Sequence, residues 1–302
     1  MDVKKLLSGR LKWHAIAFFT IFIWAITFLT TKSLEETFTN LEILVFRYSL
    51  AYVVIWMICP KKPEWYGWKT EGLIILASIC GTSFYQYMEN LSVYYTTPAS
   101  VSFITAMAPL FTAIFSKFIL KTRLELKTVI GMIVSIIGVG FISFGDSKII
   151  DTGLLGDMII LFVIWLWAIY TIIIKILSEK EIKGYLLTRK LFFYSLIEML
   201  IPVILTFDVK KSDFSVNNIG GLVFLGIFAS AICFFTWNLS VEKLGPVTTS
   251  KYLFVMPIIT LVAQIVTGMS ELSIIAVNGM CLVLAGLIFS QPDMELMRKK
   301  KD

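Results

Sequence analysis

The chain has 302 residues, of which 57% are hydrophobic and only 16% are charged, and its mean hydropathy is +0.82. Soluble domains carry about 25% charged residues, so this composition excludes a soluble globular protein. The formal net charge of +6 does not point to nucleic acid, because basic residues gather at the cytoplasmic ends of membrane helices. The composition therefore predicts an integral membrane protein with no nucleic-acid partner.

Ten apolar blocks follow one another along the chain, separated by short segments with charges or turn residues. They cover residues 13–31, 43–59, 72–93, 98–120, 126–144, 154–177, 186–207, 218–240, 246–268 and 273–290. A membrane helix needs about 20 residues, whereas a barrel strand needs about 10 with alternating polarity. The blocks predict an all-α integral membrane fold of ten transmembrane helices with short tails at 1–12 and 291–302. The first block is too long for a signal-peptide core, so we expect it to be retained.

The distribution of basic residues predicts the orientation. With the N-terminus in the cytoplasm, 21 of the 27 Lys and Arg residues fall on the cytoplasmic side, and Arg47 and Lys251 fall within blocks. The remaining four fall outside, namely Lys32, Lys148, Lys210 and Lys211. Positive charge marks the cytoplasmic side. Both termini are therefore predicted to be cytoplasmic, and the number of spans is predicted to be even.

The two halves of the chain repeat one pattern. The tripeptide WAI at 24–26 recurs at 167–169, and NLSV at 90–93 recurs at 238–241. At the second offset, of 148 residues, two prolines (98 and 109) match 246 and 257, and two glycines (131 and 138) match 279 and 286. These matches predict five-helix repeats at 13–145 and 154–290. Because each repeat has an odd number of spans, the second must be inverted, as in many secondary transporters.

These features resemble the EamA branch of the drug/metabolite transporter superfamily. The resemblance covers about residues 13–290 and rests on NLSV with its two following prolines and on the paired glycines of spans five and ten. It implies a carrier of small metabolites or drugs, often amino acids, that are usually exported. The family pattern has an acidic residue after spans four and nine. Glu271 supplies it in the second half, but Arg123 stands at the aligned position in the first, which makes that repeat atypical.

Charged side chains within the spans are candidates for transport chemistry, because charge in hydrocarbon is costly. Glu198 falls about 13 Å into span seven by helical rise, where it is either a proton-coupling carboxyl or a structural one. Glu89 either attracts a substrate amine or is an interfacial residue. Lys251 either meets an anionic substrate group in a central cavity or snorkels to the cytoplasmic interface. Arg47, one turn inside span two, is expected to snorkel outward.

Aromatic residues at repeat-matched or polar-flanked positions are candidates for lining a substrate cavity, with core packing as the alternative for each. They are Trp24, Tyr85, Phe103, Trp167, Tyr170, Trp237 and Tyr252. At the 148-residue offset Phe103 matches Lys251 and Glu89 matches Trp237, so both members of each pair should face one cavity. An aromatic cavity with one acid and one base suits an amphipathic zwitterion or an organic cation.

Two prolines and four glycines have structural expectations. Pro109 and Pro257 interrupt spans four and nine, either as gating hinges or as static kinks. The paired glycines of spans five and ten are expected to allow close helix packing.

The expected function is secondary active transport of a small organic metabolite across a plasma membrane, with an amino acid or related amphipathic compound favoured and export the favoured direction. Lys299 and Lys300 match a dilysine retrieval signal and raise a nucleotide-sugar carrier as an alternative, although the spans hold few basic residues for its phosphates. The sequence also leaves open an organic-cation or drug carrier, a channel, a membrane enzyme and a scaffold. No H-E-x-x-H, paired-aspartate or P-loop motif occurs, so we expect no catalytic residue, cofactor or metal. The expected partners are the substrate, the lipid bilayer and protons, with the chain a monomer or homodimer.

Overall fold

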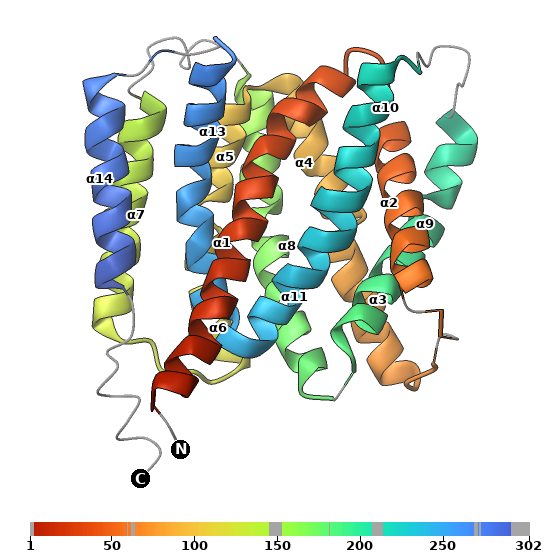
Figure 1. Ribbon diagram of the computed structural model, residues 1–302, viewed down its shortest axis with the longest axis horizontal. Coiled ribbons are helices and arrows are strands. Elements are labelled where there is room, and N and C mark those ends of the chain that lie inside the picture. Colours follow the sequence, from red (N-terminus) through yellow and green to blue (C-terminus); the bar gives the residue numbers. More distant parts are fainter. Residues whose placement is uncertain are drawn as a thin grey trace.

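The computed structural model describes residues 3–58, 60–61, 64–144, 153–180, 182–206, 214–268, 271 and 273–290. In this part of the chain the regular secondary structure is entirely helical, and the helices form one upright bundle (Figure 1). The predicted C-terminal tail at 291–302 and Lys148, Lys210 and Lys211 lie outside the described residues. In chain order the helices are α1 (Val3–Leu34), α2 (Asn40–Ile58), α3 (Trp68–Gly81), α4 (Phe84–Tyr95), α5 (Pro98–Thr105), α6 (Ala108–Ile119), α7 (Leu126–Phe144), α8 (Leu154–Ser178), α9 (Gly184–Thr206), α10 (Val216–Val223), the π-helical turn η2 (Phe224–Ile232), α11 (Cys233–Leu244), α12 (Pro246–Ser250), the 3-10 segment η3 (Lys251–Val255), α13 (Met256–Val266) and α14 (Ile274–Phe289).

The helices have the length and surface of membrane spans. Six helical stretches are long and apolar enough to cross a bilayer: Arg10–Leu34, Asn40–Ile58, Pro98–Ile119, Leu154–Ser178, Val216–Leu244 and Pro246–Val266. Two shorter apolar helices cover Leu126–Ile142 and Ile274–Phe289. A helix suits hydrocarbon because it satisfies its own backbone hydrogen bonds. The all-helical class is thus confirmed for the described residues, while the number of ten crossings and the inverted relation of the halves stay predictions.

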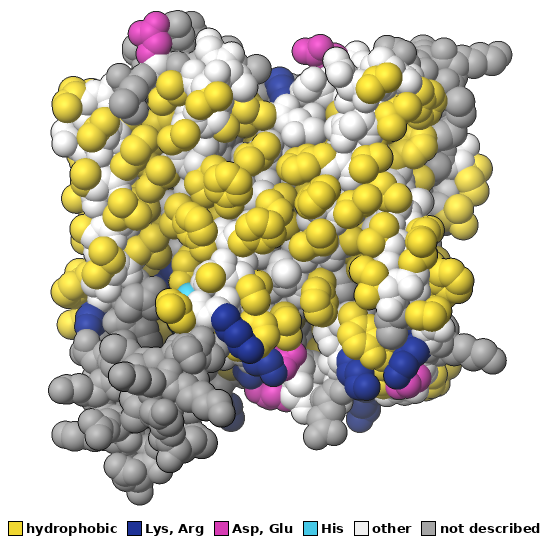
Figure 2. Space-filling model, in the orientation of Figure 1, with side chains coloured by type: hydrophobic (Ala, Val, Ile, Leu, Met, Phe, Trp, Pro, Cys, Tyr) yellow, Lys and Arg dark blue, Asp and Glu magenta, His cyan; other side chains and the backbone are white. Residues whose placement is uncertain are grey.

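Charge collects at the ends of the bundle. Figure 2 shows a hydrophobic middle on the visible face, with Lys and Arg gathered at the end where α1 begins. The last turns of α6, α8 and α11 carry Lys117, Lys175 and Lys243, and α1 carries Lys32 in its last turn, at the opposite end. Lys117, Lys175 and Lys243 thus lie at one end of the bundle and Lys32 at the other, while the assignment of the first end to the cytoplasm stays a prediction.

Several spans are broken within the bundle, and hydroxyl groups or prolines lie at the breaks. Between α3 and α4, the Thr82 hydroxyl donates to the Ser78 carbonyl at 2.8 Å. Pro109 and Pro257 each lie in the first turn of a new segment, α6 and α13. In the first turn of a helix the backbone N–H groups have no partner within the helix, so a proline there costs no helical hydrogen bond. The two prolines thus stand at equivalent breaks in the two halves.

The two halves of the chain interlock through their first helices. Helix α1 packs against α11 and α13 of the second half, while α8 packs against α4 and α6 of the first. Helices α7 and α14 pair with each other at the side of the bundle (Figure 1). This reciprocal packing buries α8 among the helices of the first half and forms an interface between the halves at the centre of the molecule.

Helices α7 and α14 approach closely because glycines meet at their crossing. A Cβ at Gly138 would lie 2.7 Å from the Gly279 carbonyl oxygen, and one at Gly286 would lie 2.5 Å from the Gly131 carbonyl oxygen. The expectation that the paired glycines serve close packing is therefore confirmed.

Gly138→Val should lower the stability of the protein by about 1–3 kcal/mol, because the added side chain forces the two backbones apart. Thermal unfolding of the purified protein in detergent measures the effect. Gly72→Val is the matched control, since a Cβ at Gly72 meets no atom within 4 Å. Equal unfolding temperatures for the two variants would contradict the close pairing of α7 and α14.

Glu35 lies in the turn directly after α1 and carries a buried carboxyl group. Both of its carboxylate oxygens are buried without a hydrogen-bond partner among the described residues. Burial raises the pKa of Glu35 to about 8, against the lowering effect of the Lys32 charge. The folded protein therefore holds this proton more tightly than the unfolded chain does.

The raised pKa of Glu35 gives a pH dependence with a definite sign. Its protonated form favours folding below the ordinary carboxyl pKa, and this contribution is lost as the pH rises toward 8. We expect the unfolding temperature of the Glu35→Gln variant, relative to the unmodified protein, to rise between about pH 5 and about pH 8.5. The difference between the two melting curves isolates Glu35 from other titrating groups, and a difference independent of pH would exclude this role.

Candidate functional site

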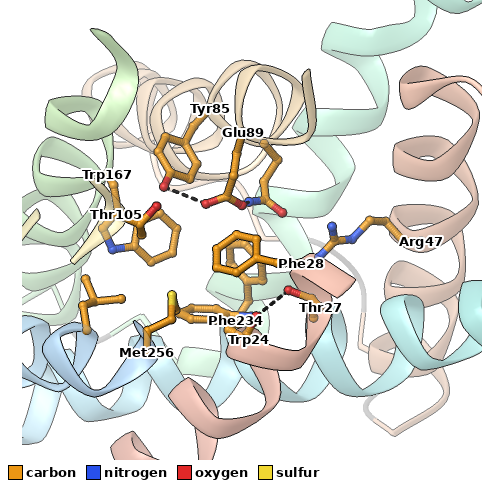
Figure 3. Close-up of a pocket in the computed structure, with 12 residues that line it drawn as sticks. Trp24, Thr27, Phe28, Arg47, Tyr85, Glu89, Thr105, Trp167, Phe234 and Met256 are labelled. Atoms are coloured by element: carbon orange, nitrogen blue, oxygen red, sulfur yellow. Dashed lines mark hydrogen bonds between the residues drawn. The ribbon is translucent and has the colours of Figure 1, made fainter. Parts of the chain in front are cut away.

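A closed cavity lies at the interface between the two halves of the chain (Figure 3). Residues from both halves line it: Trp24, Thr27, Phe28, Arg47, Tyr85, Gln86, Glu89, Thr105, Trp167, Phe234, Leu253 and Met256. Its volume is about 30 Å³, which is room for about two water molecules. A larger solute can therefore occupy it only after the surrounding helices move apart.

Glu89 lies on the α4 wall of the cavity, where its carboxylate is held by its own helix. The Tyr85 hydroxyl donates to Glu89 Oε1 at 2.8 Å, and the Gln86 amide donates to Oε2. Burial without a counter-charge would be costly for this carboxylate. The charge of Arg47 interacts with it and offsets part of that cost.

Arg47 reaches the cavity from α2, and the expectation that it snorkels outward is wrong. Its side chain is only 3% exposed, and its Nε donates to the Ser230 hydroxyl of η2 at 2.9 Å. Figure 3 shows the guanidinium directed at the cavity. Ser230 belongs to a π-helical turn, a feature often found at functional sites. Sequence reasoning missed Arg47 because its position near a helix end suits snorkelling equally well.

The cavity has aromatic walls built around three tryptophans. The ring centroids of Trp24 and Trp167 lie 5.3 Å apart, and Trp237 packs behind both at 5.3 and 5.5 Å. Tyr85 and Tyr170 contact Trp167 at 5.2 and 5.0 Å. The structure thus brings five of the seven aromatic candidates together, with Tyr170 and Trp237 directly behind the lining residues.

The indole nitrogens of these tryptophans differ in their partners. Trp24 Nε1 donates to the Ala229 carbonyl at 2.9 Å. In contrast, Trp167 Nε1 has no hydrogen-bond partner among the described residues, although it is buried. A buried donor without an acceptor is costly, and this one belongs to a residue that lines the cavity. The atom is not exposed to the cavity in this structure, so a solute could reach it only after the neighbouring side chains move.

Three predicted binding residues lie away from this cavity. Lys251 is 2% exposed and donates to the Ser290 carbonyl at the end of α14. Tyr252 donates to or accepts from His14 Nδ1 at 2.7 Å. Phe103 packs at the border of the two hydrophobic cores. Of the two repeat-equivalent pairs, Glu89 and Trp237 thus meet at the cavity region, and Phe103 and Lys251 do not.

Glu198 also lies away from the cavity, in a cluster of hydroxyl groups at the break between α3 and α4. Its Oε2 accepts from the Ser78 hydroxyl at 3.0 Å and from the Ser83 hydroxyl. Ser195 joins the same cluster, at 3.0 Å from Ser78 Oγ and 2.5 Å from Thr82 Oγ1. Tyr48, the neighbour of Arg47, donates to the Thr82 carbonyl at 2.7 Å. A chain of polar groups therefore runs from Glu198 toward the residues of the cavity.

Polar contacts hold the bundle together at both ends. At the end where α3 begins, a buried ion pair joins Lys190 to Glu71, and the Tyr194 hydroxyl donates to Glu71 Oε2 at 2.6 Å. At the opposite end, Lys32 of α1 donates to the Val93 carbonyl of α4 at 2.7 Å. The first contact joins the two halves, whereas the second lies within the first half.

Comparison with known families decides what kind of protein contains this cavity. The model of the EamA-like transporter family matches the chain twice, over residues 11–144 and 154–290. The chain belongs to the EamA-like transporter family. It is therefore a multi-pass membrane transporter, and the resemblance drawn from the sequence is confirmed.

Relatives of this EamA-like transporter carry the same kind of name. An uncharacterized transporter of Archaeoglobus fulgidus is 27% identical over 279 residues, which is 91% of this chain and 97% of the relative. One of Clostridium kluyveri is 27% identical over 72% of this chain and 71% of the relative. The YyaM transporter of Bacillus subtilis is 24% identical over 71% of each chain. These names argue against the membrane-enzyme alternative.

A solved protein crystal structure shares the fold of this EamA-like transporter. It superposes with a TM-score of 0.75 at 16% sequence identity and covers 96% of this chain and 99% of the other. At this identity the likeness concerns the arrangement of the helices alone. The substrate must therefore be argued from the cavity.

Proposed function

We propose that this EamA-like transporter carries a small amphipathic zwitterion, such as an amino acid, through the closed cavity between its halves. The observation that carries the proposal is that one base, Arg47, and one acid, Glu89, line the same small aromatic cavity. Without substrate the two opposite charges partly compensate each other. A zwitterion offers each of them a direct counter-charge within the cavity.

Each end of such a substrate has a matching group. The guanidinium of Arg47 makes one hydrogen bond to a described residue, through Nε. Its terminal nitrogens remain for a carboxylate, which a guanidinium holds by two parallel bonds. The substrate ammonium fits Glu89 and the faces of Trp24 and Trp167, which attract cations.

The transport cycle follows from two inverted five-helix repeats, at 13–145 and 154–290, within ten membrane spans. The two separate family matches and the reciprocal packing of α1 and α8 support this arrangement. Rocking of the two halves opens the cavity to one side at a time. Opening toward the cytoplasm separates Lys190 of the second half from Glu71 of the first. Pro109 and Pro257, at equivalent helix breaks, serve as hinges.

The direction and setting of transport complete the proposal. The predominance of basic residues on one side supports cytoplasmic termini in a plasma membrane. Export is the direction implied by the family resemblance. Glu198, linked to the cavity region by hydroxyl groups, couples transport to protons. An organic-cation carrier is the second candidate, because Glu89 and the aromatic walls alone would suffice for a cation. It leaves the buried Arg47 without a function.

Counterflow in proteoliposomes tests the proposal. Vesicles loaded with an unlabelled zwitterionic amino acid should accumulate the labelled compound transiently, and the flux should saturate. A thermal-shift screen with amino acids, amines and nucleotide sugars selects the compound, since a bound ligand stabilises the fold. Flux that rises linearly with concentration would indicate a channel instead. Stabilisation by amines alone would favour the organic-cation carrier.

A further inference from the structure

A larger hollow lies on the side of the bundle and shares no lining residue with the closed cavity. It lies between α2, the α3–α4 break and α9 and has a volume of about 550 Å³, within the usual range for small-molecule sites. We name it the side groove. Its lining is formed by Leu41, Ile79, Ser83, Phe84, Tyr87, Met88, Glu198, Met199 and Pro202.

The side groove is apolar except at one place, where Glu198 stands. Glu198 is the one charged residue among those that line it. Its Oε2 accepts hydrogen bonds from Ser78 and Ser83. Its Oε1 is buried and has no hydrogen-bond partner in the described part of the chain. A carboxylate oxygen in such surroundings favours a cationic N–H donor, because a charge-assisted hydrogen bond offsets its desolvation.

The side groove opens on the outer surface of the bundle. Two of its wall residues, Ile79 and Phe84, are 37% and 39% exposed, and in a membrane protein such side chains face lipid. Glu198 lies eight residues before the end of α9 at Thr206, about 12 Å by helical rise. An occupant therefore needs an apolar body that enters from the bilayer and a positive group that reaches well below its surface.

We propose that the side groove binds a single-chain amphiphilic amine, with its alkyl chain along Phe84 and Met88 and its ammonium at the carboxyl group of Glu198, whose side chain turns toward the groove to receive it. The depth of Glu198 distinguishes this occupant from a bilayer phospholipid. The amine of a phospholipid headgroup is tied to a phosphate, which would have to be drawn into hydrocarbon with it. A free alkylamine brings one charge only, and Glu198 compensates it.

Photolabelling of the full-length protein in phosphatidylcholine nanodiscs tests the site. The probe is dodecylamine with a diazirine in its chain, used without a substrate or a gradient. Labelled peptides should come from α4 and α9. Unlabelled dodecylamine should suppress labelling at a concentration at least about tenfold lower than dodecanol, a difference of about 1.4 kcal/mol. Equal competition by the two compounds, or labels placed elsewhere, would overturn the proposal.

Variants assign the preference to Glu198. Glu198→Gln keeps the shape and the hydroxyl contacts but removes the charge, so dodecylamine and dodecanol should compete equally. Glu242→Gln, at the end of α11, should keep the tenfold preference. Ile79→Trp narrows the side groove from its exposed wall and should weaken both competitors. A preference that survives in Glu198→Gln refutes the role of the carboxylate. If phosphatidylethanolamine in the nanodiscs abolishes labelling, the lipid amine competes for the side groove. That result would contradict the proposal and identify a lipid headgroup as the occupant.

Discussion

Arg47→Gln should weaken transport of a zwitterionic amino acid at least about tenfold in apparent affinity, which corresponds to about 1.4 kcal/mol. The variant removes the group that would hold the substrate carboxylate by two bonds, and it removes the positive charge that acts on Glu89 in the same cavity. Counterflow rates over a range of substrate concentrations, measured in proteoliposomes of equal protein content, give the affinity.

The substrate itself provides the sharper control. Glu89→Gln should weaken substrates that carry an ammonium, whereas Arg47→Gln should weaken those that carry a carboxylate. A decarboxylated amine should therefore lose little affinity in Arg47→Gln but much in Glu89→Gln. Arg123→Gln, an exposed arginine outside the cavity, is the matched control for the loss of one positive charge. Equal losses for amine and zwitterion in Arg47→Gln would remove Arg47 from the binding site.

Glu198→Gln should abolish uphill transport driven by a pH gradient and spare exchange of substrate for substrate. Exchange needs the cavity and its motions only, whereas coupling to protons needs a group that gains and loses one. Glu198 is placed for this, beside Ser78, Ser83 and Ser195 and at the start of a polar chain toward Tyr48. The glutamine retains the acceptor for these hydroxyls, so the helix break should stay intact.

Two parallel measurements on the same vesicles separate the steps. One records accumulation under an imposed pH gradient, and the other records counterflow without a gradient. Glu179→Gln, an exposed carboxylate in the turn after α8, should leave both unchanged. If Glu198→Gln accumulates substrate as well as the unmodified protein does, proton coupling runs through another group. If counterflow is lost as well, Glu198 is needed for substrate binding or for the conformational change rather than for proton coupling alone.

The aromatic part of the site could be anticipated from the sequence more fully than its charged part. Trp24 and Trp167 occupy equivalent positions in the two halves, and their rings meet at 5.3 Å on opposite sides of the interface. Here the two repeated tryptophans meet where the two halves of the chain pack against each other. Lys251 and Phe103 are also equivalent, yet they lie away from the cavity. Equivalent positions in the two repeats therefore predict that two residues occupy corresponding places in the two halves. They do not predict that both residues line the cavity.

By itself the sequence determined the family, the all-helical class and the residues that correspond between the halves. These follow from the length of apolar blocks, from composition and from repeated motifs, all of which are local properties of the chain. Only the tertiary structure decided the direction of each charged side chain. Arg47 points into the bundle because it donates a hydrogen bond to Ser230 of η2 and interacts with the charge of Glu89. Lys251 donates a hydrogen bond to the Ser290 carbonyl. A long cationic side chain near a helix end reaches either the bilayer surface or the interior, and the partners on neighbouring helices decide between them.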